Sequence, residues 1–103
     1  GYNRKILVLG DMLELGPLEE EYHYKLGSSV DAGKIDYVFT YGKLSESIAR
    51  GAKEVLGDDR AFSFQEIQQL SNELKKYVTG ETIVLVKGSR GMALEEVVHA
   101  LQQ

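Results

Sequence analysis

A short segment near the C-terminal end carries the residues best suited to bind an anion. Four aliphatic residues at 83–86 precede the turn Lys87-Gly88-Ser89-Arg90, and apolar residues at helical spacing follow it. The aliphatic run predicts a strand buried on both faces. A strand, a glycine turn and a helix present free backbone N–H groups to an anion, and Lys87 and Arg90 would add positive charge. The turn therefore predicts a site for a carboxylate or a phosphate.

Two interpretations of this turn stay open. In the first, the backbone amides and the two cations hold an anion. In the second, the turn is an ordinary helix start that Ser89 caps, and the cations are solvated. Spacing alone does not decide, because short glycine motifs match by chance. The turn is not a P-loop, since Lys87 precedes the glycines instead of following them.

A second polar loop follows an aliphatic run that ends at Gly10, and it contains Asp11 and Glu14. These carboxylates could coordinate Mg²⁺ or orient an amine. Alternatively they are solvated, with one of them capping a short turn. The spacing favours this second interpretation, because two carboxylates three residues apart define no metal geometry. No metal site is predicted.

His23 lies in the helix that is expected after this loop, next to Tyr22. A histidine in a helix is more often a partly packed surface residue than a general acid or base. The sequence shows neither a Ser/His/Asp arrangement on recognisable loops nor a cluster of metal ligands. We therefore predict a binding domain without a catalytic residue of its own.

The elements that must position these residues alternate along the chain. Strands are expected at 4–9, 37–41, 61–64 and 82–86, and a helical apolar stripe follows each of them. The stripe of the first helix is Leu18, Tyr22, Leu26 and Val30. The order β-α-β-α-β-α-β-α predicts a Rossmann-like, three-layer α/β/α fold with a mainly parallel sheet. Strand order 4-1-2-3 would bring the two polar loops together at the carboxyl edge and leave the fourth strand unpaired on one side.

Composition limits the function. The 103 residues contain no cysteine, which excludes disulfides, thiolate metal sites and a cysteine nucleophile. The net charge of −4, with scattered basic residues, argues against general nucleic-acid binding. Neither a signal-peptide pattern nor an apolar run of about 20 residues is present. We expect one cytoplasmic domain, not attached to a membrane.

Two segments together resemble the C-terminal domain of Mur ligases. One is Gly-Asp-Met-Leu-Glu-Leu-Gly at 10–16 with His23 beyond it, and the other is Leu-Val-Lys-Gly-Ser-Arg-Gly-Met at 85–92. The resemblance covers essentially the whole chain. It is strongest to the members that join D-alanyl-D-alanine to UDP-N-acetylmuramoyl-tripeptide in peptidoglycan synthesis.

The resemblance implies that residues 1–103 are one domain of a three-domain, ATP-dependent ligase. ATP and Mg²⁺ would be bound mainly by a central domain with a P-loop, so this domain alone would be inactive and monomeric. Lys87, Gly88, Ser89 and Arg90 would hold the carboxylate of D-alanyl-D-alanine. The resemblance puts three further residues at the cleft facing the central domain and the nucleotide: Asp11, Glu14 and His23.

Two other classes of binding protein match the sequence less well. A flavodoxin-like or receiver-like module would use Asp11 as its acidic residue, but the second acidic cluster of a receiver is missing. A dinucleotide-binding domain needs G-x-G-x-x-G after the first strand, and Gly10-Asp11-Met12 does not supply it.

Overall fold

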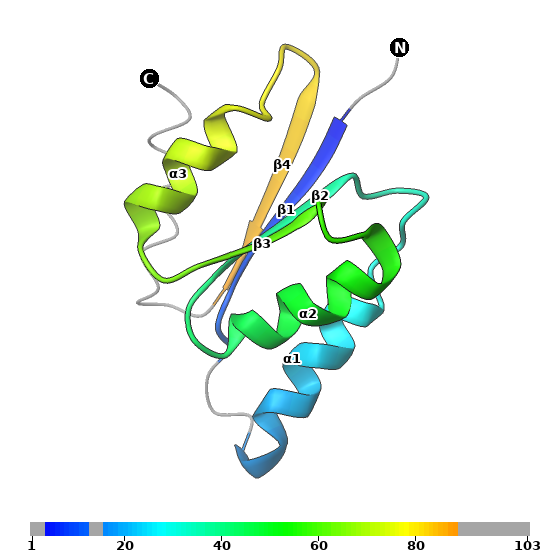
Figure 1. Ribbon diagram of the computed structural model, residues 1–103, viewed down its shortest axis with the longest axis vertical. Helices are drawn as coiled ribbons and strands as arrows, with labels where there is room; N and C mark the ends of the chain where they lie inside the picture. The colour runs from blue at the N-terminus through cyan, green and yellow to red at the C-terminus, as the bar shows by residue number, and fades with distance from the viewer. Residues whose placement is uncertain (1–3, 13–15, 89–103) are drawn as a thin grey trace.

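The computed structural model describes residues 4–12 and 16–88. Its sheet consists of β1 (Arg4–Gly10), β2 (Tyr37–Tyr41), β3 (Ala61–Phe64) and β4 (Thr82–Lys87). All neighbouring strands are parallel, in the order β3-β2-β1-β4 (Figure 1). This is the predicted order 4-1-2-3 seen from the other edge, so the predicted sheet is confirmed.

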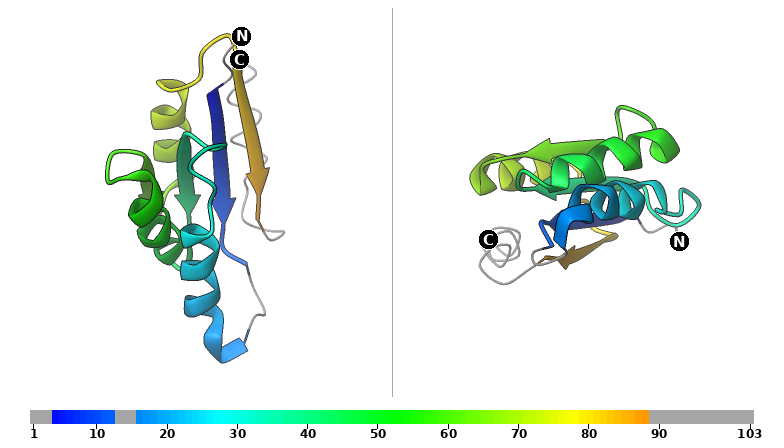
Figure 2. Two further views of the ribbon diagram at one scale, coloured as in Figure 1. Left: turned by 90° about the vertical axis from the view of Figure 1, so that its right-hand side faces the viewer. Right: turned by 90° about the horizontal axis from the view of Figure 1, so that it is seen from below.

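Helices cover the two faces of the sheet. A short 3₁₀ turn, η1 (Gly16–Leu18), leads into α1 (Glu19–Ser28). Helix α1 packs with α2 (Ser45–Leu56) on one face, and α3 (Ile67–Lys75) lies on the other (Figure 2). The predicted α/β/α layering is therefore confirmed. The helix expected after Gly88 lies outside the described residues.

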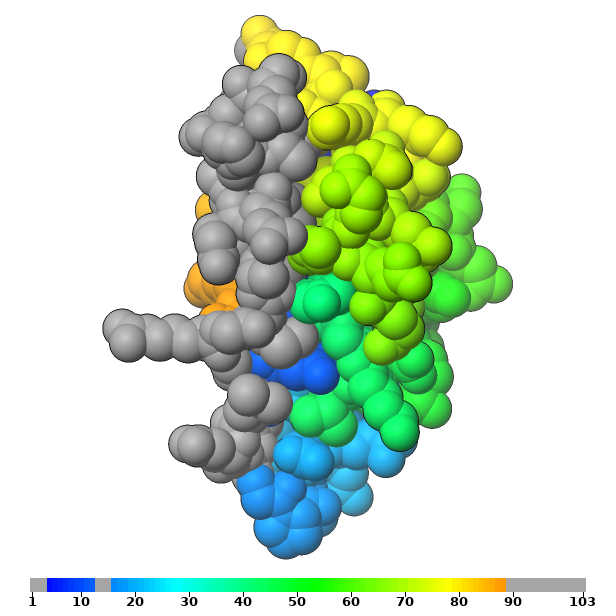
Figure 3. All heavy atoms as spheres, turned by 90° about the vertical axis from the view of Figure 1, so that its left-hand side faces the viewer, coloured from blue at the N-terminus to red at the C-terminus, as the bar shows by residue number. Residues whose placement is uncertain are grey.

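Two apolar cores lie on opposite sides of the sheet. Ile6, Val8 and Phe39 pack with α3 in one core. Val38 and Leu9 pack with α2 in the other. Adjacent residues of a strand enter different cores because side chains alternate across the sheet. The molecule is elongated, 41 × 29 × 18 Å, with α3 toward one end and α1 at the other (Figure 3). No helix in the described part of the chain is long and apolar enough to cross a membrane.

The buried face of α1 differs from the predicted stripe. Leu18 and Tyr22 are each 49% exposed, whereas His23 and Gly27 are buried. The reason is the close crossing with α2: a Cβ on Gly27 would lie 1.9 Å from the carbonyl oxygen of Ile48. This glycine contact turns the small side of α1 toward α2, so the predicted burial of Leu18 and Tyr22 is wrong.

The burial of β4 also differs from the prediction. Its residues alternate between half-buried and exposed, with Ile83 42% and Leu85 46% exposed. The prediction of a strand buried on both faces is wrong because β4 is an edge strand, and no helix in the described part of the chain covers its second face. Its expected position at the edge of the sheet is confirmed.

Candidate functional site

The ends of β1 and β4 lie side by side at the carboxyl edge of the sheet. Leu9 pairs with Lys87, so Gly10 and Asp11 continue beside Gly88. Lys87 and Gly88 are both exposed. Within residues 4–12 and 16–88, the Lys87 ammonium has neither an ion pair nor a hydrogen bond. The remaining residues predicted to bind the anion, Ser89 and Arg90, lie outside the described residues, as does Glu14.

Asp11 is engaged inside the domain. It is 8% exposed, and its carboxylate accepts hydrogen bonds from the backbone N–H of Ser45 at 2.7 Å and of Leu44 at 3.3 Å. The negative charge therefore lies at the positive end of the α2 dipole, where free amides need acceptors. The sequence suggested that one of the loop carboxylates caps a short turn; Asp11 does accept backbone N–H groups, but those at the start of α2 and not those of its own loop. The expectation that Asp11 is solvated is wrong, because the carboxylate caps a helix 34 residues along the chain.

Gly42 makes room for this contact. Its φ is +112°, and a Cβ there would lie 2.5 Å from an Asp11 carboxylate oxygen. A side chain at this position would thus strain the backbone and displace the carboxylate. Gly42 was not among the predicted site residues, because a single glycine between a strand and a helix carries no signal of its long-range partner.

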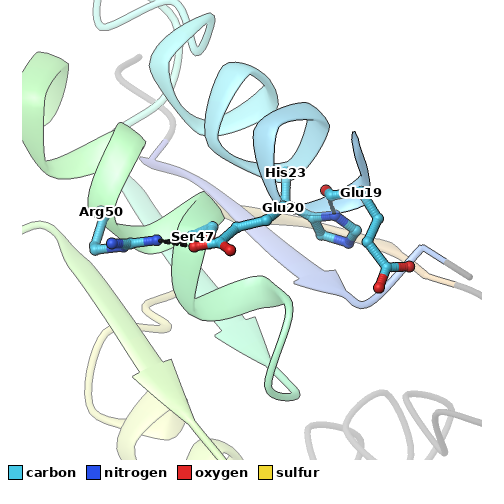
Figure 4. A network of polar contacts seen from close by, with 5 residues as sticks. All are labelled: Glu19, Glu20, His23, Ser47 and Arg50. Carbon is cyan, nitrogen blue, oxygen red and sulfur yellow. Dashed lines mark hydrogen bonds and ion pairs between the residues drawn. The ribbon is translucent and has the colours of Figure 1, made fainter. Parts of the chain in front are cut away.

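His23 links α1 to the end of β1. It is 1% exposed, and its Nε2 accepts a hydrogen bond from the Met12 N–H at 2.9 Å. Its Nδ1–H donates to the Glu19 carbonyl at 2.6 Å, and these two residues lie together in Figure 4. This pattern places the ring proton on Nδ1. The expectation of a partly packed surface histidine is wrong, since the ring is buried, with one nitrogen holding Met12 at the start of the β1–α1 loop and the other bonded to the first turn of α1.

An exposed polar network runs between α1 and α2. Arg50 contacts Glu20 at 3.1 Å and the Ser47 hydroxyl at 2.8 Å (Figure 4). These side chains line a groove of about 610 Å³ along α2, together with Lys43 and Lys53. Charges of both signs alternate there, so the groove has no marked preference for an anion or a cation.

The described residues do not fit a Mg²⁺ site. No group of three His, Cys, Asp or Glu side chains is close enough among them to hold a metal ion. Both carboxylate oxygens of Asp11 already accept N–H groups. We therefore assign no metal-dependent step to this part of the chain.

The fold and the carboxyl-edge loops agree with a known class of domain. The family "Mur ligase, glutamate ligase domain" matches residues 1–90. The chain therefore belongs to this family, and the resemblance seen in the sequence is confirmed.

Two curated relatives with the same name match nearly the whole chain. The UDP-N-acetylmuramoyl-tripeptide–D-alanyl-D-alanine ligase of Bacillus subtilis is 48% identical over 98% of this chain and 22% of its own length. The Escherichia coli ligase of the same name is 40% identical over 96% of this chain and 21% of its length. The chain thus spans about a fifth of the length of the relatives that it matches.

Solved structures show the same fold. MurF from Acinetobacter baumannii matches with a TM-score of 0.79 at 22% identity, over 98% of this chain and 22% of that one. MurF from Thermotoga maritima, solved in complex with ADP, matches with a TM-score of 0.75 at 22% identity and the same coverage.

Proposed function

We propose that this chain is the C-terminal domain of a ligase that adds D-alanyl-D-alanine to UDP-N-acetylmuramoyl-tripeptide in peptidoglycan synthesis. The observation that carries the proposal is 48% identity to a relative of that name across nearly the whole chain. The complete enzyme would be cytoplasmic and consist of three domains, with residues 1–103 as one of them.

In this proposal ATP drives amide formation. The relative from Thermotoga maritima was solved with ADP, which supports nucleotide use by the whole enzyme. ATP and Mg²⁺ would be bound mainly by a central domain, because this sequence contains no P-loop. The domain alone would be inactive, and its role would be to bind the amino component.

The proposed dipeptide site is the turn after β4. Lys87 supplies a cation that has no partner among residues 4–12 and 16–88, and Gly88 would let the backbone approach a ligand closely. Ser89 and Arg90 would complete the site for the dipeptide carboxylate. Asp11 and His23 would support the site without contacting the dipeptide, because their polar atoms are already hydrogen-bonded inside the domain. Asp11 holds the start of α2 through Ser45, and His23 holds the start of the β1–α1 loop through Met12.

An amide NMR titration of the domain with D-alanyl-D-alanine tests this site, with L-alanyl-L-alanine as the control. We expect shifts at Lys87 to Gly91 and at Gly10 to Gly16 with the D-dipeptide alone. Equal shifts with both dipeptides, or shifts elsewhere, would contradict the proposed site.

A stand-alone receiver-like module is the second function considered from sequence. It needs Asp11 to be accessible as an acceptor of a group from outside. The burial of Asp11 and its two hydrogen bonds to the start of α2 argue against that function.

A further inference from the structure

The two hydrogen bonds of the buried His23 ring define its protonation state. The backbone N–H of Met12 donates to Nε2 at 2.9 Å, so this nitrogen must offer a lone pair. The Glu19 carbonyl oxygen lies 2.6 Å from Nδ1 and therefore requires a proton on that nitrogen. Both contacts exist together only in the uncharged ring.

A second proton on the ring would break the contact with Met12. An imidazolium has N–H groups on both nitrogens, so Nε2 would become a donor that faces the Met12 donor. The ring is 1% exposed, so bulk water does not replace the lost partner of either group. The protonated ring must therefore separate from Met12, whereas the bond from Nδ1 to the Glu19 carbonyl can persist.

The charges on the surrounding elements do not hold a protonated ring in place. The charged and titratable side chains on these elements are Glu19, Glu20, Tyr22 and Lys25 on α1, Asp11 after β1, and Glu46 and Arg50 on α2. In the described part of the chain, none of these side chains bonds to a ring nitrogen. Glu20 pairs with Arg50 instead (Figure 4), and Asp11 with the start of α2.

The contact between His23 and Met12 lies next to the proposed dipeptide site. Because Leu9 pairs with Lys87, Met12 begins the loop that leaves β1 beside the turn after β4. Two side chains hold the start of this loop, Asp11 through α2 and His23 through Met12. Histidine is the side chain whose ordinary pKa puts its change of charge between about pH 5 and 8. The contact made by His23 is therefore suited to respond to pH in this range.

We propose that His23 is a positioning residue for the dipeptide site and acts only while its ring is uncharged. Protonation of Nε2 releases Met12, frees the start of the β1–α1 loop and weakens the binding of D-alanyl-D-alanine. This inference rests on the proposed function, in which the dipeptide carboxylate binds at the neighbouring turn.

Steady-state kinetics of the whole ligase from about pH 5 to 8 test this role. His23→Gln keeps an oxygen that can accept the Met12 N–H but does not titrate, whereas His23→Leu removes the acceptor. Relative to His23→Gln, the unmodified enzyme should have the same KM for D-alanyl-D-alanine near pH 8 and a KM about tenfold higher near pH 5. His23→Leu should show the higher KM throughout, and the KM for ATP should differ little among the three enzymes.

The decisive quantity is the ratio of the dipeptide KM of the unmodified enzyme to that of His23→Gln at each pH. This ratio cancels the titration of the dipeptide amine, which is common to both enzymes. A ratio that does not change with pH would overturn the role of His23. No turnover of D-alanyl-D-alanine by the unmodified ligase at any pH would instead contradict the proposed function.

Hydrogen–deuterium exchange of the whole ligase, followed by peptide mass spectrometry, tests the release of Met12 without any dipeptide. After correction for the intrinsic pH dependence of exchange, protection of peptides that contain Met12 should fall about tenfold from pH 8 to pH 5 in the unmodified enzyme. The same peptides should keep their protection in His23→Gln. Equal protection in the two enzymes near pH 5 would overturn the proposal. Both comparisons with His23→Gln remain decisive if His23→Leu does not fold.

Discussion

Two neighbouring strand ends at the carboxyl edge carry opposite charges, and only one of these charges is neutralised within the described domain. Asp11 follows β1, is buried and accepts two N–H groups at the start of α2. Lys87 ends β4, one strand away, and its ammonium points to solvent with no partner in the described ranges. The difference separates a charge that stabilises the fold from a charge that is available to a ligand.

The same difference supports the turn after β4, and not the start of α2, as the proposed anion site. A helix N-terminus attracts carboxylates through its free amides and its dipole. At α2 the domain supplies that carboxylate itself. Substitutions at Asp11 and at Lys87 therefore separate an effect on stability from an effect on binding.

Removing the buried charge should have the largest effect. Asp11→Ala deprives two amides of a charged acceptor, each contact contributing about 1.5–3 kcal/mol, so the free energy of unfolding should fall by about 3–6 kcal/mol. Urea unfolding measures this. In the control Asp31→Ala, which removes an exposed contact to the Gly33 N–H, the loss should stay below about 1 kcal/mol. Equal losses of unfolding free energy in the two variants would show that the buried contacts of Asp11 stabilise the fold no more than an exposed contact does.

Filling the space beside Asp11 should cause the second-largest loss of stability. Gly42→Ala places a Cβ at positive φ and against the carboxylate, which should cost about 2–3 kcal/mol in unfolding free energy. Gly80→Ala is the matched control, because a Cβ there meets nothing within 4 Å. If both variants unfold at the same urea concentration, the Asp11–Gly42 contact is looser than the structure shows.

Removing the exposed charge should leave stability unchanged and alter binding. Lys87→Met should shift the unfolding free energy by less than about 0.5 kcal/mol. In the whole ligase it should raise the KM for D-alanyl-D-alanine about ten- to a hundredfold, with little change for ATP, as should Arg90→Ala. Steady-state kinetics with Lys53→Met as the control measure this. An unchanged dipeptide KM would remove Lys87 from the site.

The smallest effect is expected for the contact between Tyr24 and Glu54, which lies outside the carboxyl-edge site. A hydrogen bond to the Glu54 carboxylate raises the pKa of Tyr24 above its ordinary value of 10.0. The folded state thus holds this proton more tightly, so the contribution to stability is present at neutral pH and is lost as the pH rises through the raised value. Urea midpoints measured from pH 8 to 11 should fall slightly less for Tyr24→Phe than for the unmodified chain. Identical slopes would show that the contact does not persist in solution.

The strands and their order were predictable because their signals are local. Aliphatic runs ended by glycines gave β1 and β4 to within a residue, and the alternation of elements gave the parallel sheet. The rule that parallel crossovers are right-handed then left few possible strand orders and few ways to place the helices on the two faces.

The burial of α1 and the roles of Asp11 and His23 were less accessible. Hydrophobic periodicity is read from large apolar residues, so it predicted that Leu18 and Tyr22 face the core. It gives no weight to Gly27, whose missing side chain allows the close approach of α1 to α2. The Asp11 cap joins positions 34 residues apart, and the His23 contact depends on the path of the preceding loop. Neither contact leaves a pattern in sequence spacing.

The pairing of β1 with β4 also has a consequence for synthesis. Residue 4 pairs with residue 82, so the first strand of this domain to be synthesised gains its second neighbour only when nearly the whole domain has been made. Until then one full ladder of β1 amides and carbonyls stays open. A chain that stalls or is cut before residue 82 would keep this open ladder, which can recruit strands from other nascent chains.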